Sequence, residues 1–282
     1  MTNGTAPNDR TAGEAIHTDF DQRMSYGDYL GLDRLLDAQR RLSGQHDEML
    51  FIIIHQVQEL WIKLMIHELD EAMAQIRGDE PRHAFKALAR LSRIQEQMLT
   101  AWDVLSTMTP ADYLSFRDLL GQSSGFQSHQ YRTLEFKLGN KNAAYLKPHR
   151  HRADIYEGLE KALREPSLYD ESLMLLARRG VALPASVVDR DWRLPYQASD
   201  AVEQAWLGIY RNPDERWDLY ELAEELVDVE DRFQQWRFRH MKTVERIIGH
   251  RRGTGGSAGV TYLKTALDQS FFPELWSLRT QL

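Results

Sequence analysis

The chain contains no cysteine, and this absence removes several classes of chemistry. Disulfide bonds, cysteine-ligated zinc, cysteine-ligated iron–sulfur clusters and thiolate nucleophiles are all excluded. No apolar segment follows a basic start at the N-terminus, and no later stretch reaches about 18 uncharged apolar residues. We therefore expect a soluble cytoplasmic protein with no targeting signal and no membrane contact, in keeping with a reducing compartment.

The chain also lacks an excess of basic residues and the period-two alternation of β-strands. A net charge of −7 argues against binding to nucleic acid, which needs a basic face. The composition is 42% hydrophobic and 10% aromatic over 282 residues, enough for a large core with flat rings available for stacking. The predicted fold class is all-α, a large helical bundle.

Helix signals occupy most of the chain after residue 14. Residues 1–14 are small and polar, so we expect them to be disordered, and a single all-α domain is expected over residues 15–282. Asp47 is the expected N-cap of a helix that extends to Arg77. The longest loop, Val181–Ser199, is either a lid or a surface excursion. Further helices are expected to begin at Pro81, at Pro110 and at Asp214, and another is expected to end at Gly139. Two more are expected between Lys147 and Gly180, one over Asp200 to Tyr210, and the last over Val260 to Leu282.

Two histidines lie on apolar faces of these predicted helices. His55 follows Phe51 by one turn and precedes Glu59 by one turn. His55, like His240, is either a core residue hydrogen-bonded to a neighbour or a ligand of a metal or cofactor. His240 stands where a leucine would pack, in the apolar line Leu226, Val229, Phe233, Trp236, Val244 and Ile247.

Two glycine-rich turns and one tyrosine–arginine pair add candidate site residues. The helix that begins at Pro110 is expected to place Tyr113 and Arg117 four residues apart, where they either reach one spot or lie on a solvated face. The turn Gly121–Gly125 is rich in backbone donors, and the segment Gly253–Gly256 is able to wrap an anion or to move.

Several kinds of site do not fit these patterns. Ser123 matches the GxSxG of hydrolases, but a helix and not a strand precedes it. Glu-x-x-His occurs only at residues 14–17 and 80–83, outside the core helices, which argues against a di-iron carboxylate site. The glycines at 253–256 follow a helix, which argues against a dinucleotide fold.

What remains is a large flat cofactor held between helices, with His240 as its single protein ligand, as haem requires. Apolar walls are expected from Trp102, Leu105 and Val244. The cations near His240 either form a solvated face, neutralise haem propionates or pair with the acidic run Glu221–Asp231; they are Arg237, Arg239, Lys242, Arg246, Arg251 and Arg252.

Four long segments carry a family resemblance over about Ile16 to Trp276. They are HDEMLFIIIHQVQELW, MTPADYLSFRDLLGQSSGFQSHQYRTLEFKLGNKN, LVDVEDRFQQWRFRHMKTVERIIGHRRGTGGSAGVTYL and the closing FFPELW. Together they closely resemble the bacterial type of the tryptophan 2,3-dioxygenase family. The resemblance implies an all-α homotetramer, a dimer of dimers, with non-covalent haem b and one iron per subunit. It implies the conversion of L-tryptophan and O₂ to N-formyl-L-kynurenine, which is the first step of tryptophan degradation by the kynurenine route.

The resemblance also implies roles for individual residues. His240 would be the axial iron ligand, and His55 the distal histidine that faces the indole nitrogen. Arg117 would bind the substrate carboxylate with help from Tyr113, and Thr254 would contact the amino-acid end of the substrate. These roles agree with the chemistry of the side chains, because an unpaired buried indole N–H costs about 1–3 kcal/mol and an arginine fork matches a carboxylate.

Further residues would complete the pocket in the same way. Phe51 would wall the indole, Ser124 and Gly125 would lie against the haem beside Trp102, and no role follows for His129. Three residues near the start of the chain either pack locally or enter a neighbouring subunit's pocket, as the resemblance implies: Tyr26, Tyr29 and Leu30.

Three other functions stay open as alternatives. An indoleamine-type dioxygenase would have looser substrate choice, against which the distal His55 and the amino-acid clamp argue. A haem-based gas sensor has no use for Arg117, Tyr113 and Thr254 beside the distal pocket. A purely structural bundle would be colourless.

Overall fold

The computed structural model describes residue 17 and residues 20–282, and these divide into two compact units. One unit ends at Arg40, and the other is Arg41–Leu282. The segment 1–14, expected to be disordered, lies outside the described residues.

The described part of the first unit holds two short helices, α1 (Tyr26–Leu30) and α2 (Leu32–Leu36). Ser25 caps α1 in a capping box with Asp28, and Gly31 separates the two helices with a φ of 62°, a conformation that favours glycine. The α1 side chains predicted to enter a neighbouring subunit are exposed: Tyr26 and Tyr29 at 75% and Leu30 at 44%.

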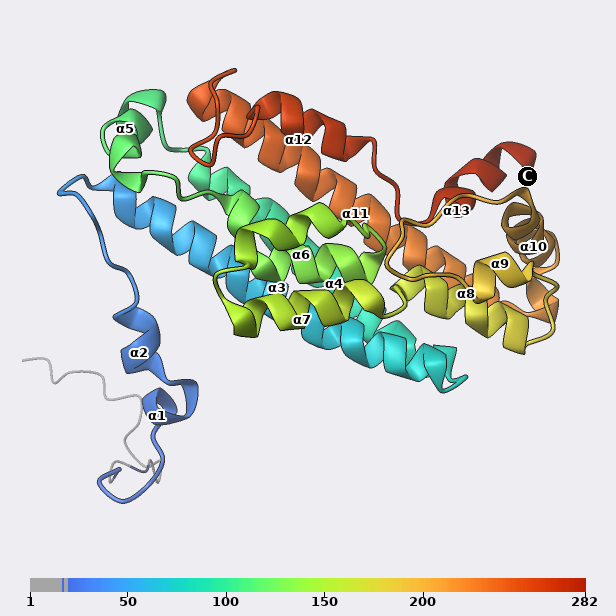
Figure 1. Ribbon diagram of the computed structural model, residues 1–282. Coiled ribbons are helices and arrows are strands. Elements are labelled where there is room, and N and C mark those ends of the chain that lie inside the picture. Colours follow the sequence, from blue (N-terminus) through green and yellow to red (C-terminus); the bar gives the residue numbers. More distant parts are fainter. Residues whose placement is uncertain (1–16, 18–19) are drawn as a thin grey trace, which may run out of the picture. The chain divides into compact units, whose positions relative to one another are not determined.

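Three long helices form the centre of the second unit: α3 (Asp47–Arg77), α4 (Pro81–Leu105) and α11 (Trp217–Ile248). Helix α4 packs against both α3 and α11, so the three lie side by side (Figure 1). The described residues contain no β-strand, and the all-α prediction is confirmed.

Local signals explain where these helices begin and end. Helix α3 spans the predicted residues, although His46 is its N-cap and Asp47 lies in its acidic first turn. Pro81 occupies the first turn of α4, where a missing N–H costs nothing. Helix α11 ends at Gly249, whose φ of 60° favours glycine.

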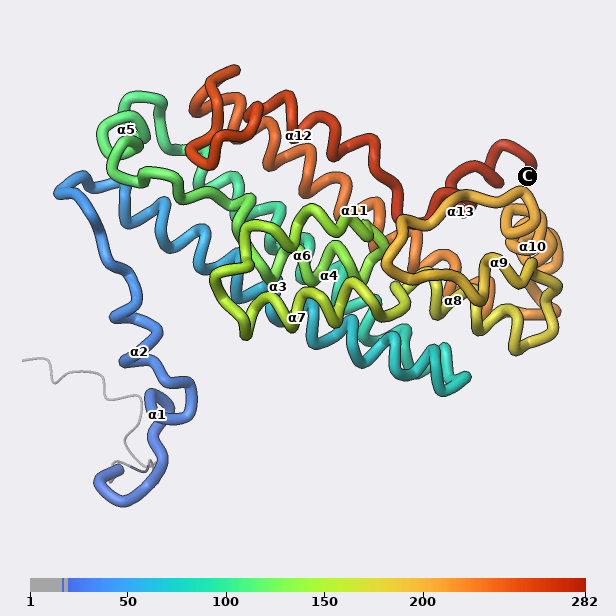
Figure 2. The backbone as a smooth tube through the Cα atoms, viewed as in Figure 1, coloured from blue at the N-terminus to red at the C-terminus, as the bar shows by residue number. Residues whose placement is uncertain are grey.

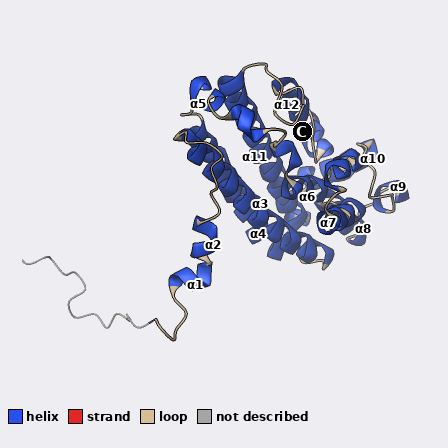
Figure 3. Cartoon of the chain, turned by 60° about the vertical axis from the view of Figure 1, so that its left-hand side comes forward, coloured by secondary structure: helices blue, strands red, loops and turns tan. Residues whose placement is uncertain are grey.

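Shorter helices surround this centre, and their order along the chain is easiest to follow in Figure 2. Helix α6 lies on α3 with α7 outside it, and α12 runs along α11, as Figure 3 shows from a second direction. The predicted Lys147–Gly180 pair is confirmed as α7 and α8. The shorter helices are α5 (Pro110–Leu114), α6 (His129–Leu138), α7 (Ala153–Arg164), α8 (Leu168–Arg178), α9 (Ala185–Val188), α10 (Asp200–Arg211), α12 (Val260–Leu267) and α13 (Pro273–Ser277).

A buried glutamine holds the three central helices in register. The side chain of Gln58 on α3 donates to the carbonyl oxygen of Met98 on α4 at 2.8 Å and accepts from the indole N–H of Trp236 on α11 at 3.2 Å. Because a buried amide must satisfy both its donors and its acceptor, it fixes the position of Trp236.

The segment Val181–Ser199 packs on the end of the bundle formed by α8, α10 and α13. Glu274 accepts hydrogen bonds from Tyr196 at 2.6 Å and from the backbone N–H of Ser199 at 2.8 Å. Arg190 pairs with the buried carboxylate of Asp170 at 2.7 Å. The segment is therefore a loop fixed to the surface of the bundle and not a lid.

Helix α3 is the one helix among the described residues that is long and apolar enough, by length and composition alone, to cross a membrane. Core helices of soluble proteins share this property. In this fold α3 packs against α4, α6 and α8.

Candidate functional site

The second unit contains a cavity of about 580 Å³ between α3, α4, α6, α11 and α12. Its volume lies in the range typical of small-molecule and cofactor sites, about 300–1,000 Å³. Nine residues predicted for the site or its apolar walls line this one cavity: Phe51, His55, Trp102, Tyr113, Ser124, Gly125, His240, Val244 and Thr254.

The imidazole of His240 is held by two tryptophans. It stacks on Trp102, with ring centroids 4.7 Å apart and planes 16° apart, and on Trp236, at 5.5 Å and 27°. Its ring nitrogens make no hydrogen bond within the described part of the chain. Burial, with a smaller contribution from His55, lowers the pKa of His240 to about 4, so the imidazole is neutral at neutral pH and able to act as a ligand.

His55 lies across the cavity on α3, one turn after Phe51. Its Nδ1 is 2.7 Å from the carbonyl oxygen of Phe51. A carbonyl oxygen only accepts, so Nδ1 carries the hydrogen, and Nε2 of the neutral ring is an acceptor. Burial lowers the pKa of His55, while the Phe51 carbonyl and Glu59 oppose that shift.

Tyr113 and Arg117 lie together, but not on one helix as predicted. Helix α5 ends at Leu114, and Arg117 begins a short 3₁₀ turn, because the chain bends at Ser115 and Phe116. Burial raises the pKa of the Tyr113 phenol, and the neighbouring Arg117 opposes this rise.

Arg117 stands at the edge of the site and does not line the cavity itself. Its Nη2 donates to the carbonyl oxygen of Arg252 at 2.9 Å, and its Nε is buried without a hydrogen-bond partner. An anionic group that reached this buried donor would complete its hydrogen bonding.

The glycine segment Gly253–Gly256, which follows α11, is docked on the Gln122–Ser124 turn. The hydroxyl of Thr254 donates to the carbonyl oxygen of Ser123. A Cβ at Gly255 would stand 2.6 Å from the Cβ of Ser124, so the two turns approach more closely than any larger residue allows. The segment therefore closes one side of the cavity.

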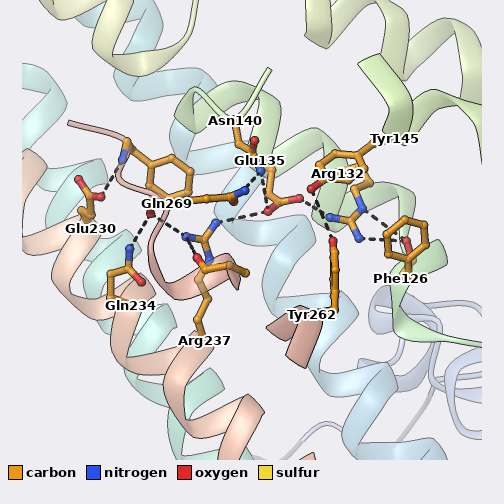
Figure 4. Close-up of polar contacts among 12 residues, drawn as sticks. Phe126, Arg132, Glu135, Asn140, Tyr145, Glu230, Gln234, Arg237, Tyr262 and Gln269 are labelled. Atoms are coloured by element: carbon orange, nitrogen blue, oxygen red, sulfur yellow. Dashed lines mark hydrogen bonds and ion pairs between the residues drawn. The ribbon is translucent and has the colours of Figure 1, made fainter. Parts of the chain in front are cut away.

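Sequence reasoning named Arg237 among the candidate cations but missed Arg132 and Glu135, which form a charged wall of the cavity with it (Figure 4). Glu135 accepts from Arg132 at 2.5 Å and from Arg237 at 3.3 Å, and all three side chains are buried. Arg237 also donates to the carbonyl oxygen of Gln269 at 3.1 Å. The available signal was the register of Arg237, four residues after the core residue Phe233, and the i,i+3 spacing of Arg132 and Glu135.

One further expectation was wrong, and one open alternative is not found. Leu105 is buried in the core and does not line the cavity. None of the cations near His240 pairs with Glu221–Asp231 within residues 20–282; the pairs found are Arg237 with Glu135, Arg239 with Asp103, and Lys242 with Glu245.

The fold and the cavity define a class of all-α protein that encloses a small-molecule or cofactor site between helices, with a histidine on each of two facing helices. The tryptophan 2,3-dioxygenase family profile matches residues 11–282. A protein of Polaromonas sp. strain JS666 described as tryptophan 2,3-dioxygenase is 60% identical to this chain, over 99% of this chain and 95% of its own length. A protein of the same description from Polaromonas naphthalenivorans is 58% identical over the whole of both chains. Another, from Cupriavidus necator, is 57% identical over 97% of this chain and 94% of its own length. The chain belongs to the tryptophan 2,3-dioxygenase family.

Proposed function

We propose that this protein is a haem-dependent tryptophan 2,3-dioxygenase, which inserts both atoms of O₂ across the indole 2,3-bond of L-tryptophan to give N-formyl-L-kynurenine. The observation that carries the proposal is the family match over residues 11–282, together with His55 and His240 on the wall of one cavity. The same match supports the substrates and the reaction.

The residues present are compatible with a flat haem in this cavity. His240 has a neutral ring that makes no hydrogen bond to the described residues, and the indole N–H of Trp102 is buried without a partner among them. A Cβ at Gly125 would meet no atom of the chain within 4 Å, so the backbone there is open to a ligand. We assign His240 as the iron ligand, with Trp102, Ser124 and Gly125 against the macrocycle, which is haem b, one per subunit. When bound, the haem iron supplies the reaction with O₂.

His55 orients the substrate through its free nitrogen. Because Nδ1 donates to the carbonyl of Phe51, Nε2 accepts the indole N–H, and Phe51 walls the ring. An indole N–H left unpaired in the cavity would cost about 1–3 kcal/mol, which favours the correctly oriented ring.

Arg117, Tyr113 and Thr254 recognise the amino-acid end of the substrate. The unpaired Nε of Arg117 is a donor for the carboxylate, and the Arg252 carbonyl holds the guanidinium in place. Charge-assisted hydrogen bonds contribute about 1.5–3 kcal/mol, which discriminates against tryptamine and indole. Thr254 brings the docked glycine segment over the substrate and excludes water.

We propose that four copies assemble as a dimer of dimers in the cytoplasm, and that residues 15–282 act as one catalytic domain. The exposed rings of Tyr26 and Tyr29, with Leu30, are then covered by entering a neighbouring subunit's pocket. Sedimentation of the full-length chain tests this assembly. A monomer with full activity would contradict it.

Turnover separates this proposal from a haem-based gas sensor. The experiment is to load the protein with haem, reduce it, add L-tryptophan in air and follow the absorbance of N-formylkynurenine. The proposal predicts steady product formation that requires L-tryptophan. Red protein that forms no product would instead favour the sensor.

A further inference from the structure

A second cavity lies beside the first, at the start of α6 and α7. Its volume is about 320 Å³, and it shares only Gln127 with the larger cavity. The residues that line it are Gln127, His129, Pro148, His149, His151, Arg152 and Ile155. It includes His129, which has no role in the proposed reaction.

The polar side chains that line this cavity are three histidines, an arginine and a glutamine, and no carboxylate from the described part of the chain lines it. His149 is only 5% exposed, and its Nε2 is buried without a hydrogen-bond partner among the residues that the structure describes. A buried imidazole nitrogen without a partner is costly, so it is a place where a bound ligand would restore a hydrogen bond. The ring of His129 lies nearby, with its centroid 6.5 Å from that of His149.

The surroundings of the cavity are positively charged although the whole chain is acidic. The run Lys147–Arg152 reads KPHRHR. Helix α6, of ten residues, and helix α7, of twelve, both begin at the cavity and direct their positive N-terminal ends toward it. The N-cap of α7, Arg152, makes no side-chain capping bond.

One carboxylate lies close to the cavity and offsets part of the positive charge around it. Asp154, in the first turn of α7, accepts from Arg152 at 2.9 Å and 3.1 Å. It neutralises part of the charge of Arg152 but does not line the cavity. The histidines and the helix ends remain, whereas the amide of Gln127 already donates to the carbonyl oxygen of Gln122 and accepts from the backbone N–H of Ser124.

A metal ion is the competing occupant, because imidazole is a common metal ligand. Within residues 20–282 and residue 17, however, no group of three or more His, Asp or Glu side chains is placed to hold a metal ion. A ligand that accepts hydrogen bonds from several imidazoles at once is favoured over a cation.

We propose that this cavity is a binding site for a small oxyanion, a phosphate or carboxylate group, held by His129, His149 and His151 with Arg152. The site does not depend on haem or on tryptophan oxidation.

The test is a calorimetric titration of haem-loaded protein with inorganic phosphate at constant ionic strength. We expect saturable binding that weakens about tenfold or more in His149→Leu and in the double variant His151→Gln/Arg152→Gln. Arg150→Gln is the matched control, because Arg150 is exposed in the same basic run and does not line the cavity. It is expected to bind phosphate as the unchanged protein does.

Three results would overturn the proposal. They are heat that rises without saturation, an equal loss in Arg150→Gln, which would indicate a general surface-charge effect, and competition of Zn²⁺ for the same histidines at lower concentration than phosphate. Turnover of L-tryptophan should persist in all the variants, since none of them changes a residue that lines the larger cavity. Normal turnover without phosphate binding would therefore reject this site and leave the dioxygenase assignment intact.

Discussion

The imidazole of His240 lies nearly parallel to the indole of Trp102, with ring centroids 4.7 Å apart. One ring comes from α11 and the other from α4, and the second tryptophan beside His240, Trp236, is fixed by its hydrogen bond to Gln58. The orientation of His240 is thus set by the protein before any ligand binds. Such pre-organisation lowers the cost of binding a flat cofactor.

Replacing His240 by alanine should abolish haem retention, because it removes the assigned iron ligand from the wall of the cavity. The measurement is the haem content after gel filtration, read from the absorption spectrum. His250→Ala is the matched control, since His250 is exposed near the end of the same helix and should leave the haem content unchanged. Full haem content in His240→Ala would refute the assigned iron ligand.

Replacing His55 by alanine should weaken turnover without eliminating it. Loss of the acceptor for the indole N–H corresponds to about 1–3 kcal/mol, or about 5- to 150-fold in kcat/KM. Complete inactivity with normal haem content would argue that His55 is an obligatory base and not an orienting group.

The pH profile offers an independent test of His55. Its pKa is lowered from the ordinary value of 6.5 mainly by burial, so the neutral form persists below pH 6.5. Protonation of Nε2 removes the acceptor, and kcat/KM should therefore fall only at a pH below 6.5. This acid limb should disappear in His55→Ala, and its persistence would assign the limb to another group.

Arg117→Lys should reduce discrimination for the substrate carboxylate. A lysine cannot reproduce the planar fork, so we expect kcat/KM for L-tryptophan to fall about 10- to 150-fold, the equivalent of about 1.5–3 kcal/mol, while that for tryptamine changes little. Arg251→Lys, an exposed change in the same region, is the control. Equal losses for both substrates would show that Arg117 acts on the fold and not on the carboxylate.

Gly255→Ala should hold the glycine segment away from its docking turn. The added Cβ would stand 2.6 Å from the Cβ of Ser124, and relieving such a contact costs about 1–3 kcal/mol. We expect a raised KM for L-tryptophan. The double variant Ser124→Gly/Gly255→Ala removes the clash and should recover most of the affinity, with Ser124→Gly alone as reference. If the double variant does not recover the affinity for L-tryptophan, the close approach of the two turns is not the reason that position 255 needs glycine.

A buried lysine away from the site should make stability depend on pH. Lys141 is 1% exposed, donates to the carbonyl oxygens of Ala162 and Glu165, and burial lowers its pKa to about 7. Between about pH 7 and pH 10 the unfolded chain therefore binds a proton that the native state does not, and the free energy of unfolding rises with pH.

The comparison with Lys141→Met isolates this effect. The unfolding free energy of the original protein minus that of the variant should rise by up to about 1.4 kcal/mol per pH unit in this range, measured by urea unfolding. A difference that does not change with pH would contradict the lowered pKa.

The helices could be predicted from the sequence because their signals are local. Helix α3 has the predicted bounds, and α11 has the predicted end at Gly249, since an apolar stripe and a glycine stop are both read within a few residues. The start of α11 was predicted at Asp214, but a 3₁₀ turn from Pro213 to Glu215 delays it to Trp217.

The tertiary contacts of the site could not be predicted in this way. The bond from Thr254 to Ser123 joins residues 131 positions apart, and the contact of Arg237 with Glu135 joins α11 to α6. No periodicity encodes such pairs. The roles of His55, Arg117 and the α1 tyrosines came from family resemblance and stay predictions; the variants above test the first two, and sedimentation of the full-length chain tests the assembly that the third requires.

The most direct test of the account is the fate of oxygen. Haem-loaded, reduced protein is given L-tryptophan under ¹⁸O₂, and the product is analysed by mass spectrometry. The account predicts N-formyl-L-kynurenine that carries two heavy oxygen atoms, with one O₂ consumed for each product molecule. A product with one heavy atom, or oxygen consumption without N-formyl-L-kynurenine, would contradict it.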